Sequence, residues 1–169
     1  ILQADTSLPP VNGQDQLRPI GEVTSKGFEI DLSTDITPNW VLLVNYGFND
    51  TKITGTITGQ AITNAVGNRF ANAPKHKLGF WTRYQIAPID AAFAVGGEYV
   101  SKRISLSGQD VKPYTIFDAS ITKGLGFAEV LLRVDNIFDK VYAASGFSAQ
   151  SGHFPGEPRT FLAELRFKF

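Results

Sequence analysis

The sequence predicts an all-β protein, specifically a segment of an antiparallel transmembrane β-barrel with about seven or eight strands. Three observations lead to this fold class. Apolar side chains recur at every second position in seven segments, which is the period of a strand with two unlike faces. Tight turns and long polar links alternate between the segments, and aromatic residues stand near the ends of the apolar rows. Short turns on one rim, long loops on the other and aromatic girdles are typical of outer-membrane barrels.

Each predicted strand has its own apolar row, with mostly polar or charged residues between its members. In chain order the rows are Phe28, Ile30 and Leu32 in residues 18–36; Trp40, Leu42, Val44, Tyr46 and Phe48 in 39–55; Leu78, Phe80, Thr82, Tyr84 and Ile86 in 74–86; Phe93, Val95 and Tyr99 in 91–105; Phe117, Ala119 and Ile121 in 113–123; Val130, Leu132 and Val134 in 127–139; and Phe161, Ala163, Leu165, Phe167 and Phe169 in 158–169. Residues 1–5 are expected to form the end of an eighth strand.

The connections alternate in length. Residues 37–39, 87–90 and 124–126 are tight turns rich in Pro, Asn, Asp and Gly, the residues that turns require. The long polar links between them are residues 6–16, 55–73, 105–112 and 140–157. If Phe169 marks a periplasmic end, every tight turn falls on the periplasmic rim.

A soluble β-sandwich also has alternating strands, so this alternative has to be weighed. Its strands are usually about 5–6 residues long, whereas several segments here are long enough for the ~9–11 tilted residues that cross a bilayer. Trp40 and Phe48 lie eight positions apart on one face, as do Phe161 and Phe169. That separation is roughly 20 Å along the membrane normal, close to the ~25 Å apolar band of a barrel. The barrel is therefore favoured.

Composition excludes several other classes of protein. Sixteen basic residues balance sixteen acidic ones, so no charge excess favours a nucleic-acid partner. Cysteine is absent, which excludes disulfides and thiolate metal sites. No segment approaches the ~20 consecutive apolar residues of a membrane helix. The chain begins at Ile1 and contains no Met, so we expect a fragment or processed product of a longer protein.

Five short motifs resemble those of one protein family. Residues 136–142 (N-I-F-D-K-V-Y) resemble the N-[LI]-F-D-K-x-Y signature on the penultimate strand of TonB-dependent receptors, and residues 156–161 (G-E-P-R-T-F) resemble the G-x-P-R start of their last strand, which ends in Phe. Residues 21–29 (G-E-V-T-S-K-G-F-E), 72–76 (N-A-P-K-H) and 114–118 (Y-T-I-F-D) are similar to the G-E-x-x-S-x-G-x-E, N-x-P-x-H and Y-x-x-x-D motifs of that family. The five motifs occur in the family's order, and the general character of the sequence is most similar to the siderophore-receptor subgroup.

The resemblance implies a barrel of about 22 strands with a plug domain inside it. Residues 1–169 would be the C-terminal portion of the barrel domain, with the plug absent. The implied function is import of ferric siderophores across the bacterial outer membrane. The implied partners are a ferric siderophore, the TonB complex (through regions absent here), the barrel assembly machinery and outer-membrane lipid. No cofactor and no nucleic acid are expected. The alternative is a small autonomous eight-stranded outer-membrane barrel with a structural or adhesion role.

Catalysis is not expected. The two histidines, His76 and His153, are far apart in sequence, with no Ser/Asp pair near either of them, and no metal site is predicted. The carboxylates expected on the inner face are Glu29, Asp31, Glu98, Asp118, Glu129 and Asp135. We expect them to form ion pairs with Lys77, Arg83, Lys102, Arg133 and Arg166, because the interior of a large barrel is wet and polar. An acid/base pair is the less favoured interpretation.

The candidate functional residues form two groups. Ligand contact is expected at the extracellular rim, where aromatic and basic side chains suit polar, anionic chelates. The rim candidates are Arg69, Phe70, Arg103, Tyr142, Phe147, His153 and Phe154. An assembly signal, implied by the resemblance, is expected in the last strand at Phe161, Leu165, Phe167 and Phe169. Loop packing or rim anchoring remains the alternative role for each rim candidate.

The signature motif itself is expected to be structural. Asn136 and Asp139 have short polar side chains that commonly bond nearby backbone groups. We therefore expect them to shape the chain where it leaves the membrane, with Phe138 and Tyr142 in an outer aromatic girdle.

Overall fold

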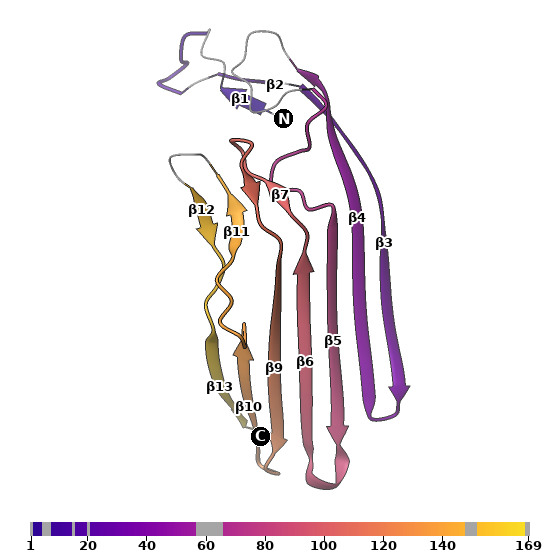
Figure 1. The fold of residues 1–169 in the computed structure, drawn as a ribbon. Coiled ribbons are helices and arrows are strands. Elements are labelled where there is room, and N and C mark those ends of the chain that lie inside the picture. Colours follow the sequence, from indigo (N-terminus) through magenta and orange to yellow (C-terminus); the bar gives the residue numbers. More distant parts are fainter. Residues whose placement is uncertain are drawn as a thin grey trace.

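The fold is one antiparallel sheet with small hairpins at one end (Figure 1). The computed structural model describes residues 2–4, 8–14, 16–19, 21–56, 66–147 and 152–167. In spatial order the seven strands of the sheet are β13 (Thr160–Phe167), β10 (Ala128–Asp135), β9 (Tyr114–Gly124), β6 (Ala91–Val100), β5 (His76–Ile86), β4 (Trp40–Thr56) and β3 (Gly21–Thr37). Strands that neighbour one another in sequence are paired in space, which confirms the predicted seven-strand meander. Within the described residues no second sheet packs on either face, so the sandwich alternative is wrong.

Three short hairpins stand apart from this sheet. They pair β1 (Leu2–Ala4) with β2 (Leu17–Pro19), β7 (Arg103–Ile104) with β8 (Asp110–Val111), and β11 (Ala143–Gly146) with β12 (His153–Pro155). The expected eighth strand at residues 1–5 is therefore wrong for the described part, because Leu2–Ala4 pairs with β2 and not with the main sheet.

Three of the predicted strands are shorter than expected at one end by three residues or more. The strand predicted at 18–36 begins at Gly21, because Leu17–Pro19 belongs to β2. The strand predicted at 91–105 ends at Val100, and the one predicted at 127–139 ends at Asp135. Asn136 and Asp139 adopt left-handed backbone conformations, with φ of 51° and 50°, and such conformations turn the chain out of the sheet.

The two ends of the sheet differ as predicted. The turns between β3 and β4, between β5 and β6, and between β9 and β10 lie at the bottom of Figure 1 with the end of β13, and the hairpins lie at the top. Asp90 closes the short 3₁₀ turn η1 (Ala87–Ile89) with φ of 46°, and Gly126 has φ of 80°. Such positive φ values suit Gly, Asn and Asp. Among the described residues, no helix is long and apolar enough to cross a membrane.

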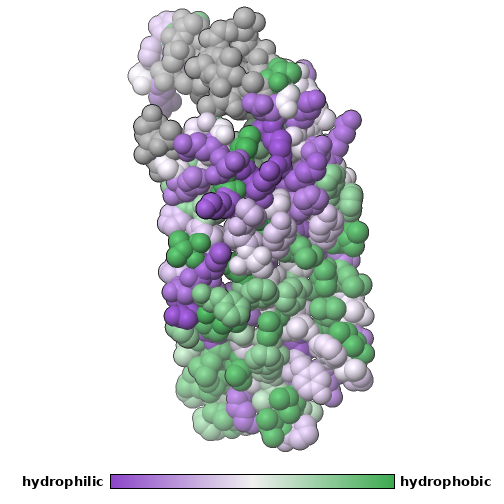
Figure 2. Space-filling view, viewed as in Figure 1, coloured by the Kyte–Doolittle hydropathy of each residue, from purple (hydrophilic) through white to green (hydrophobic). Residues whose placement is uncertain are grey.

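The register carries one apolar face across all seven strands. Phe28 pairs with Phe48, Tyr84 with Phe93, and Phe93 with Ile121. Directly paired residues share a face, so the predicted lipid-facing set is confirmed as one surface. Its members are Phe28, Leu42, Phe80, Phe93, Phe117, Leu132 and Phe167. Figure 2 shows an apolar lower zone beneath a polar upper zone.

Aromatic side chains stand at both ends of this apolar face. Near the loop rim the Phe28 and Phe48 rings stack with centroids 5.6 Å apart, and His76 lies 5.3 Å from Phe48. Near the turn rim Trp40 and Tyr84 meet edge to face at 6.5 Å. This is the arrangement expected of two girdles around an apolar band.

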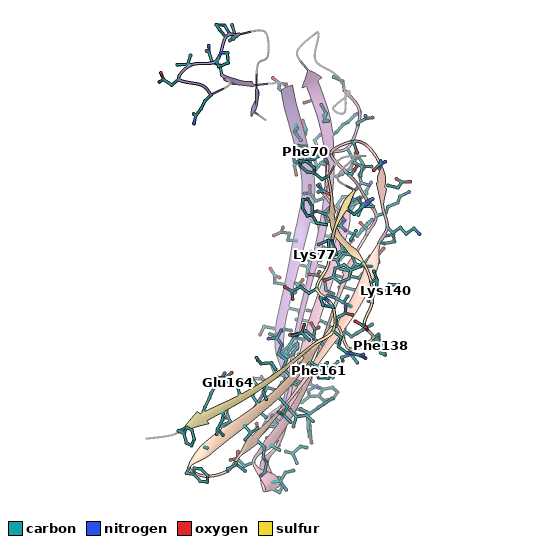
Figure 3. The ribbon with its side chains drawn as sticks, turned by 90° about the vertical axis from the view of Figure 1, so that its left-hand side faces the viewer. Phe70, Lys77, Phe138, Lys140, Phe161 and Glu164 are labelled. Atoms are coloured by element: carbon teal, nitrogen blue, oxygen red, sulfur yellow. The ribbon has the colours of Figure 1, made fainter. Side chains whose placement is uncertain are left out.

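The opposite face carries three of the predicted ion pairs. Among the described residues Glu29, Asp31, Asp118, Arg83 and Lys102 form none, and Arg83 donates to Gln85 instead. Lys77 Nζ lies 2.8 Å from Glu98, Arg133 Nε lies 2.7 Å from Asp135, and an Arg166 nitrogen lies 3.6 Å from Glu129. The side chains of these pairs are partly exposed to solvent, so each pair contributes little to stability. In Figure 3 Glu164 and Phe138 point to opposite sides of the sheet.

Part of this inner face is apolar, whereas the sequence predicted that it would be polar throughout. Near the turn rim Leu43 pairs with Trp81, and Trp81 pairs with Gly96. A Cβ on Gly96 would lie 2.2 Å from the Trp81 ring, so the indole lies across a position that only glycine leaves open. Ala92 and Ala94 are buried on the same side.

Candidate functional site

Three chain segments at the rim opposite the turns contain the predicted ligand contacts. These are the described end of the β4–β5 link (residues 66–75), the β7–β8 hairpin with its flanks (101–113), and the link from β10 to β13 (136–159), which contains β11 and β12. They lie together above β6, β9 and β10 in Figure 1.

The β7–β8 hairpin has a small core of its own. Val111 and Ser105 are buried, and the Ser105 Oγ accepts a hydrogen bond from the Gln109 N–H at 3.0 Å. Gly146 of β11 packs directly on this core, since a Cβ there would lie 2.5 Å from Ser105 and 2.7 Å from Val111. The close approach of β11 to the hairpin therefore depends on glycine at position 146.

Arg103, a predicted ligand contact, lies inside this packing. Only 5% of it is exposed. Its guanidinium donates hydrogen bonds to the carbonyls of Ala144 at 2.5 Å and Ala143 at 2.8 Å. The same group lies 5.5 Å from the centre of the Tyr114 ring. In this arrangement Arg103 joins β7 to β11 and presents little surface to a ligand.

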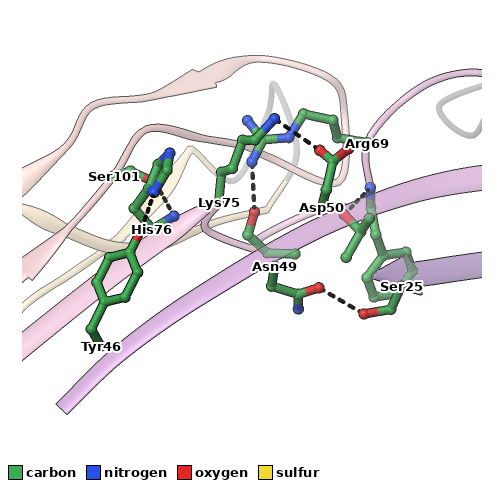
Figure 4. Close-up of polar contacts among 11 residues, drawn as sticks. Ser25, Tyr46, Asn49, Asp50, Arg69, Lys75, His76 and Ser101 are labelled. Atoms are coloured by element: carbon green, nitrogen blue, oxygen red, sulfur yellow. Dashed lines mark hydrogen bonds and ion pairs between the residues drawn. The ribbon is translucent and has the colours of Figure 1, made fainter. Parts of the chain in front are cut away.

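Arg69 and Phe70 lie at the start of the segment that leads into β5. The Arg69 guanidinium donates to the Ala73 carbonyl at 3.4 Å, and the Phe70 N–H donates to the Thr51 Oγ1 at 3.1 Å. Both residues are half-buried. Nearby, Lys75 pairs with Asp50 at 3.1 Å (Figure 4).

Tyr142 lies on the inner side of the rim and not in an outer girdle. Its ring contacts the Tyr114 ring with centroids 4.3 Å apart and the two planes tilted by 39°, and the Tyr114 hydroxyl donates to Glu98 at 3.0 Å. Glu98 belongs to the polar face of the sheet. Burial raises the pKa of the Tyr142 phenol, so this group stays neutral at physiological pH.

The remaining rim candidates are exposed. The rings of Phe147 and Phe154 meet edge to face at 6.0 Å, and 54% of Phe154 is exposed. His153, beside Phe154, is also exposed. His153 and Tyr142 line a groove of about 580 Å³ between the β7–β8 hairpin and the β11–β12 hairpin. The other residues of the groove are Asp110, Lys112, Pro113, Lys140, Val141, Ala143 and Pro155.

The signature motif shapes the neck of the last link, as expected. Asn136 is 3% exposed, and its amide donates to the carbonyls of Lys140 and Glu157, both at 3.0 Å. Its Oδ1 accepts from the Lys140 N–H at 2.8 Å, while its own N–H donates to Asp118 at 2.8 Å. The Asp139 carboxylate accepts from the Arg159 N–H at 3.1 Å. Asn136 and Asp139 thus hold both ends of the link together.

The predicted assembly residues lie on the apolar face. Phe161, Leu165 and Phe167 alternate along β13 and are exposed. Phe138 also lies on this side, 73% exposed, with its ring 5.8 Å from Phe117 (Figure 3). Phe169 lies outside the described residues.

Sequence reasoning missed Asn72, which bonds two other rim segments. Its amide exchanges a pair of hydrogen bonds with Gly146, both 2.9 Å. It also missed Lys112 and Lys140, which line the groove with His153. The only available signal for Asn72 was its place in the N-A-P-K-H motif.

The side chains at the rim are of kinds that can bind a ligand. Within the described ranges, no group of three or more His, Asp or Glu side chains is placed to hold a metal ion. The groove combines cationic groups with a neutral phenol, and an exposed aromatic pair stands beside it. Such groups bind anions and planar rings.

Comparison with known proteins gives the chain its relatives. Residues 1–137 match the family described as "TonB dependent receptor-like, beta-barrel". The chain is 28% identical over 159 residues to the "Ferrichrome outer membrane transporter/phage receptor" of Escherichia coli K12, covering 88% of this chain and 20% of that protein. It is 29% identical over 160 residues to the "Catecholate siderophore receptor Fiu" of E. coli K12, with the same coverage. The chain therefore spans about a fifth of the length of these relatives.

Solved structures show the same fold. The crystal structure of the siderophore receptor PiuA from Acinetobacter baumannii matches with a TM-score of 0.77 at 23% identity, covering 92% of this chain and 23% of that one. The closed form of the ferric-catecholate import receptor Fiu from E. coli K12 matches with a TM-score of 0.75 at 24% identity, covering 95% and 23%.

Proposed function

The chain belongs to the TonB dependent receptor-like β-barrel family of bacterial outer-membrane receptors, and we propose on this basis that it is the C-terminal part of the barrel wall of a ferric siderophore importer. The observation that carries the proposal is that the resemblance to curated siderophore receptors extends over 88% of the chain. The continuous apolar face of the sheet supports a place in lipid.

The proposal divides the work of the receptor between this chain and the rest of the protein. Residues 1–169 supply barrel wall, a share of the extracellular rim and the assembly signal of the last strand. The plug and the contact with the TonB complex belong to other parts of the receptor. The partners of these residues are the ferric siderophore at the rim, outer-membrane lipid at the apolar face and the barrel assembly machinery at β13. The chain performs no catalysis in this scheme.

The autonomous eight-stranded barrel receives no support from the sheet. β3 and β13 lie at opposite edges of the seven described strands and do not pair with each other. An open edge leaves backbone N–H and C=O groups unpaired, which is costly in lipid. Further strands are therefore needed for closure.

The transport proposal is tested by iron uptake in whole cells. A strain lacking the full receptor gene, and the same strain complemented with it, would be given radiolabelled ferric complexes of catecholate and hydroxamate siderophores. We expect uptake of at least one complex only with the receptor and only when TonB is present. Uptake that is equal with and without the receptor for every complex, at normal receptor abundance, would contradict the proposal.

Within the rim we propose that the exposed residues contact the ligand and that the buried ones support them. Tyr142, Phe147, His153 and Phe154 form the contact set, with Arg69, Phe70 and Arg103 behind them. His153→Ala or Phe154→Ala should weaken siderophore binding about tenfold, which corresponds to ~1.4 kcal/mol. The measurement is binding to whole cells at matched surface abundance. Unchanged affinity in both variants would show that the rim of this segment does not contribute to ligand recognition.

A further inference from the structure

We propose that Asn72 and Arg103 are positioning residues: they join three rim segments into one body and thereby set ligand affinity without contacting the ligand. The segments are residues 66–75, the β7–β8 hairpin (101–113) and the β11–β12 hairpin (143–155). The part that concerns affinity rests on the proposed function, whereas the joining of the segments does not.

Asn72 bonds to both hairpins at once. Its side-chain Nδ2 donates to the Gly146 carbonyl, and its Oδ1 accepts from the Gly146 N–H, each at 2.9 Å. Its backbone N–H donates to the Ile104 carbonyl at 2.7 Å. Its φ of 58° is a conformation that asparagine tolerates better than most residues. The Asn72 side chain thus bonds to the Gly146 backbone as a neighbouring strand would, although the two residues are 74 positions apart in sequence.

Arg103 makes the second connection. Its two terminal nitrogens bond to consecutive carbonyls of β11, and its Nε is buried and has no hydrogen-bond partner among the described residues. A buried cation is stable only where polar groups replace water. The two carbonyls and the face of the Tyr114 ring provide that replacement. A lysine has one ammonium and cannot reproduce this planar two-point contact.

The seam between the hairpins is otherwise thin. The Leu106 N–H donates to the Gly146 carbonyl at 3.4 Å, and the Ser107 N–H donates to the Phe147 carbonyl at 3.1 Å. Gly146 packs against Ser105 and Val111. Asn72 and Arg103 add four side-chain hydrogen bonds to these two backbone bonds, and so make most of the hydrogen bonds described between β11 and the other rim segments.

The joined hairpins carry the binding groups. Asp110 and Lys112 line the groove from the β8 side, and Tyr142 and His153 line it from the other side. Phe147 and Phe154 stand at the end of the second hairpin. The spacing between these groups is fixed only while the hairpins are joined. Fixing it beforehand reduces the entropy lost on binding and so raises affinity.

The joining is tested by hydrogen exchange on the full-length receptor in detergent. Asn72→Gly keeps the backbone conformation and removes the side-chain amide that bonds to Gly146. Arg103→Lys keeps the positive charge and removes the planar guanidinium that bonds to two carbonyls at once. We expect amides of residues 143–147 to exchange about tenfold faster in either variant, the effect of losing one or two hydrogen bonds that hold the segment closed. Lys112→Ala is the control, because Lys112 is an exposed groove residue whose side chain makes no hydrogen bond to β11 among the described residues, and exchange of residues 143–147 should stay unchanged in this variant. Unchanged exchange in both Asn72→Gly and Arg103→Lys overturns the proposal.

The affinity part has its own measurement. Half-saturation of siderophore uptake should rise about three- to tenfold in Asn72→Gly and Arg103→Lys, with the maximal rate preserved, because saturating ligand restores the joined state. Faster exchange with unchanged half-saturation would overturn positioning. If Asn72→Gly does not reach the membrane, Asn72→Asp decides in its place, since its carboxylate accepts from the Gly146 N–H but cannot donate to the carbonyl. A receptor that binds no siderophore at all contradicts the proposed function, while the exchange data still decide whether the segments are joined.

Discussion

Asn136 shows how one residue can shape a long link. Its side chain satisfies two carbonyls and one N–H from both ends of residues 136–157, and its φ of 51° directs the chain out of the sheet. The signature motif of the sequence is therefore a structural clamp. Under the proposed function, ligand contact falls to residues further along the link.

Replacement of Asn136 tests this role. Asn136→Asp is nearly isosteric but loses both amide donors, so the carbonyls of Lys140 and Glu157 lose the bonds that Asn136 gives them. We expect a loss of ~1–3 kcal/mol in the free energy of unfolding, measured by urea titration of the full receptor in detergent. Asn45→Asp, on the solvent-facing wall of β4, is the control and should have little effect. Equal stability of the two variants would show that the Asn136 bonds are dispensable.

At the level of the element, each strand separates lipid from the lumen by alternation alone. In β10, Leu132 pairs with Ile121 and Ala163 on the apolar face, whereas Leu131 pairs with Thr122 and Glu164 on the polar face. Two adjacent leucines thus face different solvents.

This difference can be measured directly. Leu132→Arg should cost ~2–4 kcal/mol, because a charge near the middle of the bilayer is poorly solvated. Leu131→Arg, one position away, should cost much less, because its side chain faces the polar interior. Unfolding of both variants of the full receptor in lipid vesicles would give the comparison. A larger cost for Leu131→Arg would reverse the assignment of the two faces.

The last strand carries a second prediction at this scale. Phe161, Leu165 and Phe167 form an exposed apolar row on β13 that Phe169 would continue in sequence. Deleting Phe169 from the full receptor should lower its amount in the outer membrane, because the assembly machinery is expected to bind this strand. Siderophore affinity of the molecules that do assemble should not change. Normal assembly with lost binding would assign the tail to ligand recognition.

For the whole molecule, the decisive feature is the open sheet. Both edges, β3 and β13, present backbone groups that the described residues leave without a neighbouring strand. β3 is 17 residues long, so this edge is extensive. Residues 1–169 by themselves should therefore not refold in detergent into a heat-modifiable, protease-resistant monomer. Gel mobility with and without boiling is the measurement, with the full receptor as the positive control. A closed monomer would revive the autonomous-barrel alternative.

The sequence by itself determined the seven strands of the main sheet, its apolar face and the end of the sheet at which each tight turn lies. Alternation at every second position is a local signal, because successive side chains of a strand point to opposite faces whatever lies further away. Phe28, Phe93 and Leu132 could therefore be placed on one surface before any pairing was known. The turn residues are equally local, since a positive φ or a fixed φ selects Gly, Asn, Asp or Pro.

Only the tertiary structure decided what the rim residues do. Asn72 and Gly146 are 74 positions apart, and no period links them. Arg103 and His153 look alike in sequence as basic loop residues, yet one is buried against two carbonyls and the other is exposed. Whether a loop cation faces ligand or backbone depends on which other loops pack around it. That packing arises from contacts between distant segments, which local patterns of residues do not encode.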